Sequence, residues 1–245
     1  MRSIRAPHGW RVTMGLRRTI AVRLLRLVMF LLCKIDASEY VSAVRDGRLR
    51  DGTPVPPMII AVNHINFLDV PILVSQAHPR LVVGIIKDTT WDNPLMAFLF
   101  DTFDAIPLKR DGAFLDAFKR AKEAIDNGAF IGIAPEGTRS GTGILQKGKP
   151  GILELAMMTK TPVLPVAHCG GQHFWKNIRC FKRTPIVYKV GRPFYFKTKG
   201  GAFPRADREK YIDELMIQIA SLLPEELRGE YAGRVSEKCD RLEFL

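Results

Sequence analysis

Short apolar runs alternate along the chain with segments whose apolar residues recur at helical spacing. The runs, each typical of a buried strand, lie at residues 58–62, 81–86, 105–108, 129–134, 162–167 and 186–190. Helix candidates lie at residues 94–100, 114–125, 151–159 and 207–223, and Asn127-Gly128 closes the second of them. The alternation predicts a single α/β domain with a mixed, largely parallel sheet flanked by helices, whose functional groups gather in loops at strand ends.

The net charge of the chain limits the chemical classes of partner that it attracts. The 37 Lys and Arg residues outnumber the 25 Asp and Glu residues, and the resulting net charge of +12 attracts nucleic acid, anionic lipid or phosphorylated metabolites. Nucleic acid is disfavoured, because the cations are spread along the chain and no recognition motif is visible. The four cysteines have no CxxC spacing, so neither a zinc site nor a disulfide framework is expected and a reducing compartment is predicted.

Residues 17–35, RRTIAVRLLRLVMFLLCKI, suggest contact with a membrane. The longest uncharged run, residues 27–33, is far shorter than the roughly 20 apolar residues of a spanning helix. On a helical wheel Arg23, Arg26 and Lys34 share one narrow side and apolar residues cover most of the rest, which predicts an interfacial amphipathic helix. A buried core helix and a cleaved signal peptide remain as alternatives, although the internal arginines disfavour the second. We expect a peripheral or monotopic protein on the cytoplasmic face of the cell membrane.

The first strand opens into the segment NHINFLDVP, in which His64 stands at a strand end and Asp69 follows five residues later. Contact between the two requires a turn, and Pro71 supports one because proline is tolerated in the first turn of a helix. A neutral histidine can take a proton from an alcohol while a carboxylate holds its other nitrogen. No GxSxG serine motif is present, so the hydroxyl would belong to a substrate. A hydrogen-bonded strand-end histidine with a helix-capping aspartate is the structural alternative.

A second polar loop, PEGTRS at residues 135–140, follows the 129–134 strand. Gly137 permits close backbone approach and Arg139 offers a planar fork suited to phosphate, although a structural turn with an Arg–Glu ion pair would have the same sequence. His168 and His173 stand beside glycines after another strand, which is typical of local hydrogen bonding rather than metal binding. The basic, aromatic stretch from Trp175 onward could touch lipid headgroups or a donor's phosphates, or be a solvated loop.

The two loops together resemble the NHxxxxD and EGTR blocks of the lysophosphatidic acid (1-acyl-sn-glycerol-3-phosphate) acyltransferase family, in the same order and at a similar separation. FDAIPLKR at residues 103–110 is similar to the family's intervening block through Ile106, Pro107 and Arg110, although Asp104 stands where that block often has glycine. Lys147-Gly148 and VLPVA at residues 163–167 also match the family pattern. The resemblance covers residues 57–196.

We expect a membrane-interacting segment at residues 1–40, which lies outside the resemblance, and an α/β acyltransferase domain at residues 41–245. The resemblance implies acyl transfer in phospholipid biosynthesis, from a coenzyme A or acyl carrier protein thioester to a lysophospholipid hydroxyl. The expected acceptor is 1-acylglycerol-3-phosphate, with anionic membrane as a partner and no metal or prosthetic group. A non-catalytic anionic lipid-binding protein, or an acyltransferase for another lysolipid such as lyso-ornithine lipid, remains as an alternative.

The same resemblance assigns roles to residues. His64 would be the base and Asp69 its holder, while Glu136 would orient neighbouring cations or contact the acceptor. Backbone N–H groups near Gly137 could stabilise an oxyanion. The residues implied in substrate binding are Arg110, Glu136, Gly137, Thr138, Arg139 and Lys147.

Overall fold

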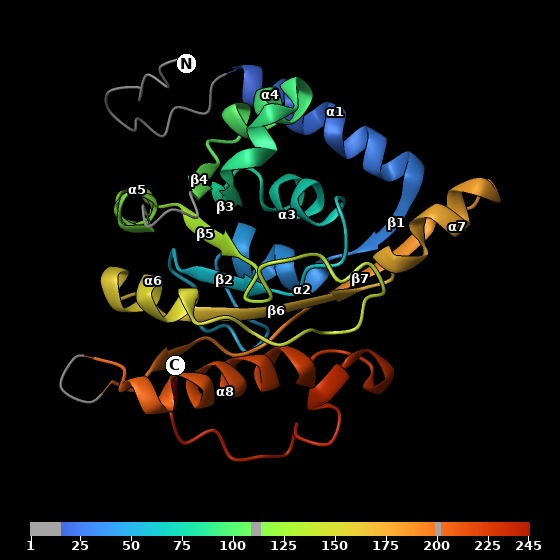
Figure 1. Ribbon diagram of the computed structural model, residues 1–245. Coiled ribbons are helices and arrows are strands. Elements are labelled where there is room, and N and C mark those ends of the chain that lie inside the picture. The colour runs from blue at the N-terminus through green and yellow to red at the C-terminus, as the bar shows by residue number, and fades with distance from the viewer. Residues whose placement is uncertain (1–15, 109–113, 199–201) are drawn as a thin grey trace.

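The computed structural model describes residues 16–108, 114–198 and 202–245, which build a sheet covered by helices on both faces (Figure 1). The strands run in the order β1-β7-β6-β2-β5-β3-β4, and β8 pairs with β6 and β9. All described pairings are parallel except β6 with β7, β6 with β8 and β8 with β9, so the predicted mixed, largely parallel sheet is confirmed. The strands are β1 Cys33–Asp36, β2 Ile59–Val62, β3 Val82–Lys87, β4 Ile106–Leu108, β5 Phe130–Ile133, β6 Val163–Cys169, β7 Thr184–Val190, β8 Phe194–Phe196 and β9 Leu242–Phe244.

The helices fall close to where periodicity places them. The α-helices are α1 Leu16–Leu32, α2 Ser38–Tyr40, α3 Asp69–Ala77, α4 Pro94–Thr102, α5 Phe114–Asp126, α6 Gly151–Thr159, α7 Phe174–Arg179 and α8 Arg208–Ser221. The amphipathic helix corresponds to α1, the helix expected at Pro71 to α3, and the other four candidates to α4, α5, α6 and α8, whereas α2 and α7 were not anticipated. A π-helical turn covers Val41–Arg45, and short 3-10 turns cover Asp88–Asp92, Gly171–His173, Arg205–Asp207, Glu225–Leu227 and Gly229–Tyr231.

The core has two halves, one on each face of the sheet. Successive side chains of a strand point to opposite faces, so Ile59 and Ala61 of β2 join buried residues of α5, α6 and α8. Ile60 and Val62 join the opposite half, which includes Met29 of α1 and buried residues of α3. All four residues of β2 are buried, which explains why this strand lacks the polar alternation of a surface strand.

The N-terminal helix α1 packs on the protein along one stripe only. Val22 and Met29 are buried, whereas Leu24, Leu27 and Leu31 are 61%, 54% and 60% exposed. The predicted helix is therefore present and carries a wide exposed apolar face, together with a core-packed one. It ends at Leu32, however, so Lys34 lies in β1 and not on the polar side of the helix as predicted. None of the helices in the described ranges is long and apolar enough to cross a membrane.

Arg26 of α1 is turned toward the protein rather than lying free on a polar face. Its Nε donates to the Ser75 carbonyl oxygen at 2.8 Å and its Nη2 to the His78 carbonyl oxygen at 3.3 Å. These carbonyls lie at the C-terminal end of α3, where a cation satisfies unpaired acceptors and the helix dipole. Arg26 thereby fastens α1 to the helix that begins at Asp69.

Strand β1 follows α1 directly and enters the sheet beside β7, with Cys33 opposite Thr184 and Ile35 opposite Ile186. It lies within the segment 1–40 that we expect to contact the membrane, and α2 continues without a break into Val41–Arg45. The division of the chain at residue 40 stays a prediction, but the two parts share one sheet.

Candidate active site

The register of three neighbouring strands brings distant residues to one edge of the sheet. Strand β2 is parallel to both β5 and β6, with Ala61 opposite Ile133 and Val62 opposite Val166. His64 and Glu136 each lie three residues beyond the first matched pair, and His64 and His168 each lie two beyond the second. The carboxyl ends of parallel strands meet at the same edge, where α/β proteins build their sites.

His64 and Asp69 are in direct contact across a turn. The His64 Nδ1 atom lies 2.7 Å from Asp69 Oδ2, and the side chains are 22% and 4% exposed. The same carboxylate oxygen accepts backbone N–H bonds from Ile65 at 2.7 Å and Asn66 at 3.0 Å, which holds the turn closed. Asp69 is the first residue of α3, and Pro71 lies in its first turn, so the predicted turn and helix start are confirmed.

The charge on Asp69 is maintained despite its burial. Burial raises the pKa of the Asp69 carboxyl, but attraction and hydrogen bonds from His168 and His64 outweigh this and hold the pKa well below its ordinary value. A carboxylate on Nδ1 favours the tautomer with its proton on that nitrogen. The His64 Nε2 atom makes no hydrogen bond with any residue that the structure describes, so it can accept a proton.

Glu136 joins the two loops through backbone atoms. Its Oε1 accepts the His64 N–H at 2.6 Å, its Oε2 accepts the Gln146 N–H at 2.9 Å, and the residue is 2% exposed. Burial raises the pKa of the Glu136 carboxyl above its ordinary value, although the two amide hydrogen bonds oppose the shift. The carboxylate thus contacts backbone amides, and it orients no cation among the described residues. Its expected contact with the acceptor stays a prediction.

Further backbone hydrogen bonds connect the loop of His64 with the loop of Glu136. The Ser140 N–H donates to the His64 carbonyl oxygen at 2.8 Å, and the Gly141 N–H donates to the Ile65 carbonyl oxygen at 3.0 Å. The residue before Ser140, Arg139, is therefore held beside the turn of His64 by backbone hydrogen bonds of its own loop.

The predicted phosphate-binding side chains are open to solvent. Thr138, Arg139 and Lys147 are exposed, and neither cation makes a hydrogen bond or ion pair with any described residue. Gly137 has φ of +67°, in the left-handed region that favours glycine, and a Cβ there would come within 3.1 Å of the Lys149 side chain. Arg110 lies outside the described residues, so its place in the site stays a prediction.

Asn63 and His168 belong to the site although their part in it was not anticipated. The Asn63 side chain exchanges hydrogen bonds of 2.9 and 2.8 Å with the His168 backbone, and His168 Nε2 lies 3.1 Å from the Asn63 carbonyl oxygen. The same Nε2 atom lies 3.5 Å from Asp69 Oδ1. The expected local hydrogen bonding of His168 is confirmed. No local signal in the sequence shows its place in the site, which depends on the parallel pairing of β2 with β6.

The described residues contain no group of three or more His, Cys, Asp or Glu side chains that could hold a metal ion. What the arrangement offers chemically is an oriented imidazole whose open nitrogen can take a proton. Two unpaired cations lie on the adjoining loop and suit an anionic group.

Known proteins resemble the chain in both sequence and fold. The Acyltransferase family model matches residues 43–169. A chloroplastic 1-acyl-sn-glycerol-3-phosphate acyltransferase of Brassica napus, BAT2, is 31% identical over 116 residues, which cover 46% of this chain and 33% of that protein. The 1-acyl-sn-glycerol-3-phosphate acyltransferase of Pseudomonas aeruginosa is 41% identical over 110 residues, 42% of each chain.

A crystal structure of the 1-acyl-sn-glycerophosphate acyltransferase PlsC from Thermotoga maritima has the same fold. The TM-score is 0.55 at 21% identity, and the match covers 86% of this chain and 81% of that one. The chain spans about a third of the length of the plant relative and under half of the Pseudomonas protein. The family match covers just over half of the chain and includes His64, Asp69 and Glu136. The chain therefore belongs to the acyltransferase family, and it is similar to the 1-acyl-sn-glycerol-3-phosphate acyltransferases within it.

Proposed function

We propose that this protein transfers a fatty acyl group from a coenzyme A or acyl carrier protein thioester to a hydroxyl of a lysophospholipid. The preferred acceptor is 1-acylglycerol-3-phosphate, which becomes phosphatidic acid. The observation that carries the proposal is the contact of 2.7 Å between His64 Nδ1 and Asp69 Oδ2, which orients the imidazole. The Nε2 atom of the same ring is open, and the adjoining loop carries cations that pair with no described residue. The names of the relatives support the acceptor.

In the proposed reaction, His64 Nε2 removes the proton from the acceptor hydroxyl as the oxygen attacks the thioester carbonyl carbon. The C–O bond forms, the C–S bond of the tetrahedral intermediate breaks, and the imidazolium returns its proton to the departing thiolate. Asp69 stabilises the imidazolium and keeps the ring in place. The route requires no covalent enzyme intermediate and no metal or prosthetic group.

The acceptor phosphate binds to Arg139, with Lys147 and Arg110 as further cations. Because Arg139 and Lys147 are not engaged by described residues, no ion pair with any of these residues has to break when the phosphate arrives. A charge-assisted hydrogen bond of this kind contributes about 1.5–3 kcal/mol. Glu136 serves the same reaction indirectly, since it holds the His64 backbone against the loop that carries Arg139.

The exposed apolar face of α1 would place the protein on its substrate. In the proposal this face lies in the headgroup region of an anionic membrane, at the cytoplasmic side, as a peripheral or monotopic attachment. The exposed residues Leu24, Leu27 and Leu31 supply the apolar contact.

A panel of lysolipids, each assayed with acyl-CoA and with acyl-ACP for thiol release and acylated product, tests the proposal. We expect turnover that depends on lysophosphatidate and disappears in His64→Ala. A preference for lyso-ornithine lipid would support the proposed acyl transfer but contradict the proposed acceptor. Thiol release from none of the pairs, with vesicle binding intact, would favour the non-catalytic lipid-binding alternative.

A further inference from the structure

The segment 174–183, which comprises α7 and the loop after it, presents aromatic and basic side chains to solvent. Trp175 is 58% exposed and Phe181 is 101% exposed. Lys176, Arg179 and Lys182 lie between or beside them, and the whole sequence from residue 155 to residue 206 contains no Asp or Glu. Exposed aromatics among cations, without acidic neighbours in the chain, are the composition of a surface that contacts anionic lipid.

Phe181 is placed at a conformational cost. Its φ of +52° lies in the left-handed region, which is unfavourable for a bulky side chain. Its ring nevertheless packs on nothing, because the residue is fully exposed. Neither backbone preference nor internal packing accounts for a phenylalanine at this turn, whereas an apolar partner outside the molecule does.

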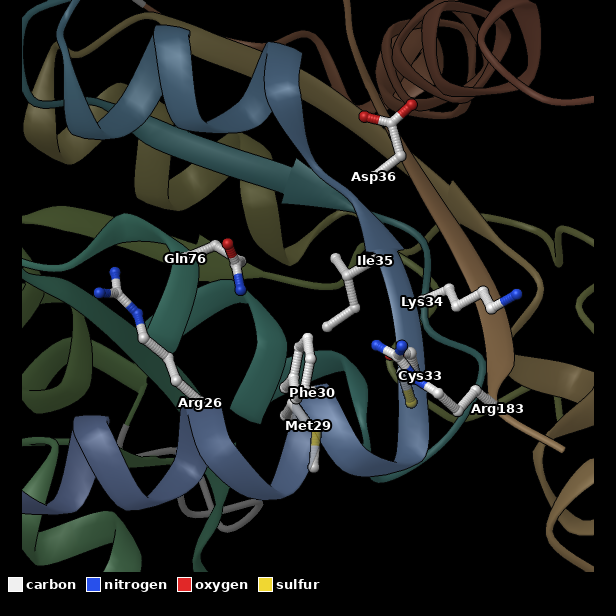
Figure 2. A pocket seen from close by; sticks show the side chains of 9 residues that line it. All are labelled: Arg26, Met29, Phe30, Cys33, Lys34, Ile35, Asp36, Gln76 and Arg183. Carbon is white, nitrogen blue, oxygen red and sulfur yellow. The ribbon is translucent and has the colours of Figure 1, made fainter. Parts of the chain in front are cut away.

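The segment is continuous with the exposed face of α1. Arg183 donates from Nε at 3.0 Å and from Nη2 at 2.5 Å to the Cys33 carbonyl oxygen, just after the end of α1. Its guanidinium also lies 4.6 Å from the ring centroid of Phe30, which is 64% exposed. Phe30, Lys34 and Arg183 are among the residues that line a pocket of about 410 Å³ at this junction. Figure 2 shows their side chains. The pocket is lined by α1, β1, α3 and Arg183, and His64 and Asp69 are not among its lining residues.

The segment also touches the catalytic loop. Phe67, three residues after His64, is 41% exposed, and its ring centroid lies 5.5 Å from that of Phe174 and 5.7 Å from that of Trp175. An aromatic cluster thus links the surface of the segment to the turn that holds the base.

We propose that segment 174–183 is a second membrane-contact element, which inserts into an anionic bilayer beside α1. Phe181 and Trp175 enter the boundary between headgroups and acyl chains, and the neighbouring cations bind lipid phosphates. Together with α1, the segment sets the loop of His64 at the depth of a lysolipid headgroup. The inference rests on the proposed function in that the acceptor is drawn from the bilayer.

The native cysteines supply a reporter and its control. Cys180 is exposed next to Phe181, Cys33 is buried, and Cys239 lies outside the segment near the C-terminus. Two labelled variants are made, and both carry Cys169→Ala. One also carries Cys239→Ser, so that bimane is attached at Cys180, and the other carries Cys180→Ser, so that bimane is attached at Cys239. On phosphatidylglycerol vesicles with doxyl-labelled lipid, we expect quenching at Cys180 and none at Cys239. No quenching at Cys180, or equal quenching at both, would overturn the proposal.

Substitution of Phe181 separates folding from membrane contact. Asparagine tolerates the left-handed conformation, so Phe181→Asn should keep or raise the Tm. Partitioning onto vesicles should fall about tenfold, as expected when a phenylalanine side chain that is buried in the bilayer is lost. The matched variant Phe244→Asn, on β9, should leave partitioning unchanged. Equal losses in both variants would contradict a specific role for Phe181.

Charge and ligand controls complete the test. Lys182→Gln should weaken partitioning roughly fivefold, in a salt-dependent way, whereas Lys238→Gln, at an 87% exposed side chain outside the segment, should not. A bimane response at Cys180 to coenzyme A but not to vesicles would overturn the membrane assignment in favour of donor binding. Quenching in His64→Ala is expected to persist. In the protein with His64 intact, an absence of acyl transfer together with intact quenching would contradict the proposed function alone. Acyl transfer without quenching at Cys180 would contradict this inference alone.

Discussion

The two loops that meet beside His64 use their polar side chains differently. In the loop of residues 63–69, the side chains of Asn63, His64 and Asp69 are engaged in hydrogen bonds within the protein. In the loop of residues 135–147, Glu136 is engaged in the same way, but Arg139 and Lys147 are exposed and bond to no described residue. In the proposed mechanism the base is therefore in place before substrate arrives, whereas the cations are available for a ligand. Changes in the first loop should therefore lower kcat, and changes at the exposed cations should raise KM.

The largest effect is expected for His64→Ala. Removal of the only group that we assign to proton transfer should lower kcat by about 10⁴-fold. The side chain is only partly buried, so the urea midpoint should change little. Steady-state kinetics and urea unfolding check both statements, and near-normal turnover would refute the role of His64 as base.

Asp69→Asn should lower kcat by about 10³-fold, because an amide neither stabilises the imidazolium nor enforces the tautomer. It should also destabilise the protein by about 1–3 kcal/mol, since an amide cannot satisfy all the donors that meet at the buried carboxylate. Kinetics and urea unfolding, with the exposed Asp116→Asn as control, test the pair of effects. A loss of activity without any loss of stability would show that the turn does not depend on Asp69.

Arg139→Ala should lower kcat/KM for lysophosphatidate by about 10- to 100-fold, mostly through KM, as expected for the loss of one charge-assisted hydrogen bond. Its Tm should match the wild type, because the side chain supports nothing in the described structure. Arg139→Lys should recover part of the affinity. An equal loss with an uncharged lysolipid would show that Arg139 does not bind phosphate.

Glu136→Gln should reduce stability by about 1–3 kcal/mol and kcat by a smaller factor than Asp69→Asn. An amide can accept only one of the two backbone N–H bonds that now tie His64 and Gln146 together, which leaves a buried donor unpaired. Urea unfolding and kinetics of Glu136→Gln measure both effects. Wild-type stability in this variant would mean that the two hydrogen bonds from the backbone N–H groups of His64 and Gln146 to Glu136 contribute little to folding.

The smallest effects concern pH, and the two buried carboxylates should respond with opposite signs. The folded-state pKa of Asp69 is lowered, so its contribution to stability is present above its unfolded pKa, about 4, and is lost as pH falls through the folded value. The folded-state pKa of Glu136 is raised by burial, so its titration lowers stability as pH rises above its unfolded pKa, also about 4. Urea unfolding between pH 3 and 7 should show the advantage of wild type over Asp69→Asn shrinking in acid. The advantage of wild type over Glu136→Gln should instead grow in acid, because ionisation of Glu136 costs stability.

Much of the fold follows from patterns within the chain. The run 151–159 coincides with α6, and the position of Pro71 correctly places the start of α3. Local patterns fail where pairing is remote: β1 has a charged residue at two of its four positions, and it is stabilised by β7 rather than by its own composition. Strands β8 and β9 have only three residues each and pair with one another across a long stretch of chain.

The site likewise has one part that follows from local sequence and another that depends on remote strand pairing. His64 and Asp69 are five residues apart, so their contact could be inferred from the turn between them. The role of Glu136 could not, because an acidic residue in a polar loop ordinarily faces solvent, and only the register of β2 with β5 brings it under the His64 amide. The same holds for His168 beside β2.

The place of β1 has a consequence for the order in which the protein is made. The arginine that binds the Cys33 carbonyl comes 150 residues later in the chain, and the whole of β7 follows it. During synthesis α1 can pack on α3 early, but β1 has to wait for β7, which is made about 150 residues later, before it can join the sheet.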